Sequence, residues 1–105
     1  MAQDQANEAA AKAVDEDRLL EGENPDTTYL EDAVHWVTVY GELLRVKREL
    51  VGVTENRLPD LPAEARREVA STDLVVLDAE AKRFSERLTF WRQRCAELGG
   101  STTTS

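Results

Sequence analysis

The sequence predicts an all-α fold: an antiparallel helical hairpin of two long helices, preceded by a short acidic N-terminal helix or arm, that completes a four-helix bundle as a dimer. Three observations lead to this fold class. Apolar residues alternate three and four positions apart over residues 70–98, prolines interrupt the chain at residues 57–62, and the first long helix carries two apolar seams. The length of 105 residues fits a single domain.

Residues 1–26 are predicted to form an acidic N-terminal arm that is partly helical. Residues 2–21 are rich in alanine, the strongest helix former, but their apolar face is thin and would bury little area. Gly22 and Pro25 then interrupt the helix. Asp26 or Thr27 is a suitable N-cap for the next helix, because either side chain can accept a hydrogen bond from a free backbone N–H group.

Residues 27–57 are predicted to form the first long helix, with two apolar seams of heptad spacing. Only Asp32 interrupts the first seam, which comprises Tyr29, Trp36, Val39, Leu43, Val46, Leu50 and Val53. Lys47 and Thr54 fill polar gaps in the second seam, which comprises Leu30, Ala33, Val37, Tyr40, Leu44, Val51 and Leu58. Because the seams lie about 100° apart around the axis, one neighbouring helix cannot cover both.

Residues 62–98 are predicted to form the second long helix, after a short connection that contains Pro59 and Pro62. All positions of its seam are apolar: Ala70, Leu74, Leu77, Ala81, Phe84, Leu88, Trp91, Cys95 and Leu98. Residues 71–73 predict a kink or a fresh start, because Ser, Thr and Asp side chains compete for backbone hydrogen bonds. Residues 99–105 are predicted to be a disordered tail.

The short connection predicts that the two long helices pack antiparallel, which covers only one seam of the first helix. Either the N-terminal helix or a second copy of the chain could cover the other seam. We expect the second copy, in a homodimer or a higher homo-oligomer, since C2 dimers are the commonest homo-oligomers. The residues expected at this self-association interface are Leu30, Trp36, Val37, Tyr40, Leu43, Leu44, Leu50, Val51, Phe84 and Trp91.

Charge is divided unevenly along the chain. Residues 1–42 contain eleven acidic and two basic residues, a net charge of −9, whereas residues 43–105 carry +1. This acidic front half disfavours nucleic acid, and it indicates either a solvated arm or one that docks on a basic protein partner. Basic patches at residues 45–48 and 82–94 leave a nucleic-acid-associated regulator as an alternative function, although no known nucleic-acid-binding motif accompanies them.

The sequence offers few residues for catalysis or metal binding. Asp32 and His35 share a helix face and loosely match the carboxylate-x-x-His pair of di-iron bundles, but a second pair could come only from a symmetry mate. Otherwise His35 packs beside Trp36 or faces solvent. Cys95 is interpreted as a small buried seam residue, and a thiol–imidazole pair with His35 would lack a third, orienting group. We therefore expect no catalytic, cofactor-binding or metal-binding residues.

The sequence lacks both a membrane-length apolar run, which needs about 20 residues, and the basic start of a signal peptide. We expect a cytoplasmic protein without membrane contact. Taken together, these features predict a non-enzymatic protein–protein interaction or regulatory module that self-associates through its helix seams. A metal- or ligand-binding helical-bundle enzyme is the least supported alternative.

Overall fold

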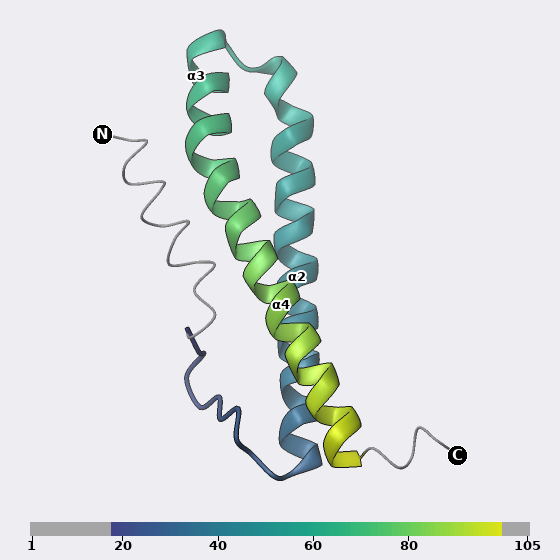
Figure 1. Cartoon of the computed structure of the whole chain (residues 1–105). Coiled ribbons are helices and arrows are strands. Elements are labelled where there is room, and N and C mark those ends of the chain that lie inside the picture. The colour runs from purple at the N-terminus through teal and green to yellow at the C-terminus, as the bar shows by residue number, and fades with distance from the viewer. Residues whose placement is uncertain (1–17, 100–105) are drawn as a thin grey trace.

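The computed structural model describes residues 18–99, and all regular secondary structure in this range is helical. Two long helices, α2 (Leu30–Arg57) and α4 (Leu74–Gly99), pack against each other as a hairpin (Figure 1). The predicted all-α architecture of two long packed helices is therefore confirmed. The helix predicted within residues 2–21 and the tail predicted for residues 99–105 lie almost entirely outside the described residues.

Helix α2 begins at Leu30, whereas the sequence placed its start at residue 27. Tyr29 is the N-cap, with an extended backbone and no side-chain capping bond. Thr27 instead connects the preceding segment to the first turn. Its hydroxyl accepts a hydrogen bond from the Tyr29 N–H (3.2 Å) and donates one to the Asp32 carboxylate (2.6 Å). These two bonds hold residues 27–29 outside the helix.

The chain between the long helices forms three short elements: the 3₁₀-helix η1 (Leu58–Asp60), the helix α3 (Ala63–Glu68) and the π-helix η2 (Val69–Asp73). Pro59 lies in the first turn of η1, where its missing N–H costs no hydrogen bond. The π-helix includes residues 71–73, where the sequence predicted a kink or a fresh start. Together α3, η2 and α4 correspond to the single helix predicted over residues 62–98.

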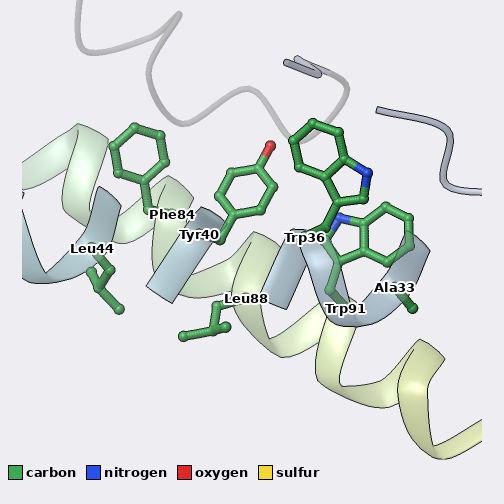
Figure 2. Packing of buried hydrophobic residues seen from close by; sticks show 7 residues of the cluster. All are labelled: Ala33, Trp36, Tyr40, Leu44, Phe84, Leu88 and Trp91. Atoms are coloured by element: carbon green, nitrogen blue, oxygen red, sulfur yellow. The ribbon is translucent and has the colours of Figure 1, made fainter. Parts of the chain in front are cut away.

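The apolar core lies where the start of α2 meets the end of α4. It comprises Ala33, Trp36, Tyr40, Leu44, Phe84, Leu88 and Trp91 (Figure 2). The Trp36 and Trp91 rings stack with centroids 6.4 Å apart, and the Tyr40 ring packs against Phe84 at 6.0 Å. Such aromatic pairs add stability beyond the area that they bury. The core is therefore formed by residues from the second seam of α2 and from the seam of α4, and by Trp36 from the first seam of α2.

The two halves of the hairpin are packed differently. The terminal half, residues 30–44 with 81–99, contains all seven core residues. The loop half, residues 45–80, contains among the described residues a single buried apolar side chain, Leu74. In Figure 1 the ribbons of α2 and α3 also stand apart at this end. A salt bridge from Lys47 to Glu80 (2.9 Å) joins the helices where the two halves meet.

Residues 18–29, which we call the strap, run beside the terminal half of the hairpin (Figure 1). Gly22 turns the strap with a positive φ of 83°, a conformation that glycine adopts without a steric penalty. This turn directs Glu23 into the hairpin, where its side chain is buried. Arg94 of α4 also donates a hydrogen bond to the Thr27 carbonyl oxygen (2.6 Å). The strap is thus attached to both long helices.

Glu23 is the centre of a buried polar network. One carboxylate oxygen accepts hydrogen bonds from the Tyr40 hydroxyl (2.5 Å) and the Leu20 N–H (2.9 Å). The other accepts from Arg87 Nη2 (2.6 Å) and Trp91 Nε1 (2.7 Å). Burial by itself would raise the pKa of Glu23, but these four hydrogen bonds outweigh it and hold the pKa below 4.5. Burial and the Glu23 contact together raise the pKa of Tyr40 to about 12.

Candidate interaction surface

An apolar strip runs along one side of α2, next to the face that packs against α4. The α2 strip comprises the first-seam residues Val39, Leu43, Val46, Leu50 and Val53. Val39 and Leu43 are half-buried, whereas Val46, Leu50 and Val53 are exposed by 42%, 44% and 56%. Isolated apolar residues on a surface are ordinary, but a continuous strip at heptad spacing is typical of a helix–helix interface.

The strip is exposed because α4 covers only one side of α2. Ala33, Tyr40 and Leu44 of the second seam point into the core and are almost completely buried. From the first seam, Trp36 is buried in this core, where its ring stacks on Trp91, and Val39 and Leu43 pack against the core while remaining half-buried. The smaller side chains from Val46 onward lie in the loop half, where the described chain leaves them exposed.

A groove of about 390 Å³ extends the strip toward the connection. Leu50 and Val53 form one wall, and Leu61 and Val69 contribute from the connection and η2. Thr54, Arg57 and Asp73 add polar groups at its rim. The apolar surface therefore continues from the exposed face of α2 into the open end of the hairpin.

The acidic residues beside the strip are paired within α2. Arg45 forms salt bridges with Glu42 (2.7 Å) and Glu49 (2.6 Å), one helical turn away on either side. Both bridges are solvent-exposed and contribute little to stability. Their effect is to reduce the net charge next to the strip, which lowers the electrostatic cost of bringing a second copy close to it.

The residues expected at the self-association interface fall into three groups in the structure. Five are buried within the hairpin of a single chain: Trp36, Tyr40, Leu44, Phe84 and Trp91. Three are half-buried: Val37, Leu43 and Val51. Two are exposed, Leu30 at 41% and Leu50 at 44%. Only Leu43 and Leu50 of these ten belong to the α2 strip.

The residues considered for metal or thiol chemistry do not form a metal site within the described residues. The described residues contain no group of three or more His, Cys, Asp or Glu side chains that could hold a metal ion. His35 is exposed, and its ring packs edge-on against Trp36 with the ring centroids 4.9 Å apart. The Asp32 carboxylate accepts a hydrogen bond from the Thr27 hydroxyl. Cys95 is a half-buried free thiol that packs against the core.

Sequence reasoning did not single out Glu23, which has the most hydrogen bonds of any side chain in the core. Its own surroundings, a glycine and an asparagine in an acidic stretch, resemble a solvated turn. A signal was nevertheless present on the two long helices. Tyr40 and Trp91 occupy apolar seam positions, and a buried hydroxyl or indole N–H usually has a hydrogen-bond partner. That requirement predicts a buried acceptor without identifying which residue supplies it.

Comparison of this chain with protein-family models, curated proteins and solved structures finds no match. In residues 18–99, no helix combines the length and the apolar character that a membrane-spanning segment needs. The fold and the α2 strip are therefore the observations on which a functional proposal can be based.

Proposed function

We propose that this protein is a helical interaction module without enzymatic activity, and that it self-associates through the α2 strip. The observation that carries the proposal is the exposure of Val46, Leu50 and Val53 at heptad spacing on one face of α2. Burying this strip against another apolar surface would gain about 25 cal/mol for each Å² removed from water.

The spacing of the strip favours a second copy of the chain as the partner. Its five residues are placed almost symmetrically about Val46. Two copies of α2 packed antiparallel would bring Val46 opposite Val46, Leu43 opposite Leu50, and Val39 opposite Val53. This arrangement has C2 symmetry and produces a four-helix bundle from two hairpins.

A charge in the middle of the strip tests the proposal. We expect Val46→Glu to weaken self-association at least tenfold, since a desolvated glutamate without a partner costs more than about 1.4 kcal/mol. Val34→Glu is the matched control, because Val34 is similarly exposed (50%) but lies about 120° around α2 from Val46. Sedimentation velocity over a wide range of protein concentrations measures both. A wild-type chain that stays monomeric, or equal effects of the two variants, would contradict the proposal.

Cysteine cross-linking tests the antiparallel arrangement directly. In a Cys95→Ser background, Val46→Cys would lie at the two-fold axis, where two cysteines can come within disulfide distance. We expect mild oxidation to convert this variant to a covalent dimer, whereas Val34→Cys remains largely uncross-linked. Efficient cross-linking at position 34 and none at position 46 would place the interface elsewhere.

The nucleic-acid alternative gains no support from the structure. Four of the eight basic side chains in the two patches are held in salt bridges: Arg45, Lys47 and Arg94 with glutamates of the hairpin, and Arg87 with Glu23. Side chains neutralised in this way are less available to phosphate groups. We therefore do not propose nucleic-acid binding as a second function.

A further inference from the structure

The two long helices provide most of the hydrogen-bond donors that hold the Glu23 carboxylate. Three of the four donors to Glu23 belong to the long helices: the Tyr40 hydroxyl of α2, and Arg87 Nη2 and Trp91 Nε1 of α4. The strap itself supplies only the fourth, the Leu20 N–H. A phenol, a guanidinium and an indole that converge on two oxygen atoms form a complete set of donors for one carboxylate.

Packing within the hairpin, rather than the strap, holds these three donors in place. The Tyr40 ring packs on Phe84, and the Trp91 ring stacks on Trp36. The Arg87 guanidinium lies over the Phe90 ring, 4.4 Å from its centroid. Tyr40 and Trp91 are completely buried. Removal of the strap would leave three oriented donors without their acceptor, which is unfavourable for buried polar groups.

The strap resembles a tethered ligand more than a packed element of the fold. Among residues 18–29, only Glu23 and Thr27 are buried. A hollow of about 350 Å³ lies between the strap and α2, bordered by Gly22 and Asn24 on one side and by His35 and Trp36 on the other. Leu20 is half-buried and packs against the core, but the rest of the strap buries little apolar surface. The Glu23 carboxylate accepts three of the hydrogen bonds that join the strap to the long helices.

The same side of α4 holds more cationic donors than Glu23 can satisfy. Arg83, Arg87 and Arg94 lie close to one helix face, and Arg83 is 2% exposed. Buried N–H groups of all three arginines have no hydrogen-bond partner among the described residues: Arg83 Nε, Arg83 Nη1, Arg87 Nε and Arg94 Nε. An excess of buried guanidinium donors favours an acidic ligand over a neutral one.

We propose that Tyr40, Arg87 and Trp91 form a carboxylate-binding site, that the strap occupies it through Glu23, and that a glutamate-bearing peptide of a partner protein can take its place. This site is separate from the α2 strip and does not depend on self-association. The tether gives Glu23 an effective concentration of millimolar order, so an incoming peptide binds well only when the strap is released.

Chemical rescue in the full chain tests the site. The protein contains only two tryptophans, so their indole N–H resonances can be followed separately by NMR. We expect Glu23→Ala to move the Trp91 resonance upfield as its hydrogen bond is lost. Added sodium acetate should return it toward the wild-type position in a saturable way, while sodium chloride at the same ionic strength should not. Glu21→Ala, which removes an exposed acid of the same strap, should leave the resonance unchanged.

A peptide with the sequence of residues 18–29 tests binding in trans. We expect it to bind the Glu23→Ala protein, and to bind about tenfold more weakly when its own glutamate at the position of Glu23 is replaced by glutamine. Wild-type protein, whose site is occupied, should bind the peptide more weakly than the variant. If the peptide induces a dimer of wild-type protein, the site exchanges straps between copies, and a separate partner is excluded.

Besides a peptide-induced dimer, two further results would overturn the proposal. One is a folded Glu23→Ala protein whose Trp91 resonance responds neither to acetate nor to the peptide. The other is equal binding of the glutamate and glutamine peptides. If Glu23→Ala fails to fold, circular dichroism replaces NMR as the measurement. Acetate or the peptide should then restore helicity, and the absence of restoration would equally overturn the proposal.

Discussion

At the scale of single residues, the hydrogen bonds of Glu23 decide how the strap is held. A buried carboxylate is unfavourable without donors, and Glu23 has four of them. The protonated acid could not accept all four bonds equally well. Attachment of the strap should therefore depend on the ionised form of Glu23 and the neutral form of Tyr40.

This dependence predicts two limits of pH. The pKa of Glu23 is lowered in the folded protein, so its contribution is fully present above its ordinary value of 4.5 and is lost as pH falls through the lower folded value. The pKa of Tyr40 is raised to about 12, so its contribution is present below its ordinary value of 10.0 and is lost between 10.0 and 12.

We accordingly expect the Trp91 indole resonance to stay constant between pH 4.5 and pH 10.0, and to shift as pH falls through the lowered pKa of Glu23 or rises toward the Tyr40 pKa of about 12. Glu23→Gln serves as the control, since it removes the acidic transition at this site. An acidic transition that persists unchanged in Glu23→Gln would contradict the assignment to Glu23.

At the scale of helical elements, two glycines weaken α2. Gly41 and Gly52 lie in its interior, and a Cβ atom built at either position meets nothing within 4 Å. Replacing Gly52 with alanine should therefore raise the free energy of unfolding by about 1 kcal/mol through helix propensity. Urea denaturation measures this change.

The same variant also distinguishes two roles for Gly52. It lies about 120° around α2 from Val46, on a different face from the α2 strip. We therefore expect Gly52→Ala to leave self-association unchanged. A loss of association in a more stable monomer would show that Gly52 allows close approach of a partner helix instead.

The π-helix η2 adds a residue to the rod formed by α3 and α4 without disturbing the core. A π-turn is an insertion into an α-helix, so deleting one of its residues should restore regular α-helix. We expect deletion of Thr72 to change the free energy of unfolding by less than about 2 kcal/mol.

Deletion of the exposed Thr89 in α4 should instead unfold the protein, because it rotates Trp91 away from Leu88 and Phe84. Near-ultraviolet circular dichroism of the tryptophans distinguishes these outcomes.

At the scale of the whole molecule, stability is concentrated in one half of the hairpin. The seven-residue core lies in the terminal half, whereas the loop half has Leu74 as its one buried apolar side chain among the described residues. Regions with few buried contacts open at lower free energy than the core. The loop half is also the location of the exposed part of the α2 strip.

Hydrogen exchange should therefore report both packing and association. In dilute protein, we expect backbone amides of residues 46–57 to exchange faster than those of residues 33–44 and 84–91. As the protein concentration rises, the amides of residues 46–57 should gain protection, each tenfold slowing corresponding to about 1.4 kcal/mol. Protection that is uniform along the hairpin, or independent of concentration, would contradict self-association through this region.

The sequence by itself determined the two long helices, their connection and the seam of α4, because these depend on apolar spacing and on prolines, which act locally. It also indicated that α2 has more apolar surface than one neighbour can cover. Only the tertiary structure decided that Trp36 joins the core while Val46, Leu50 and Val53 stay exposed, since this depends on how far α4 extends around α2. Tertiary structure alone also brought Glu23 to Tyr40, Arg87 and Trp91. Contacts between residues 17 to 68 positions apart leave no periodic pattern in a sequence.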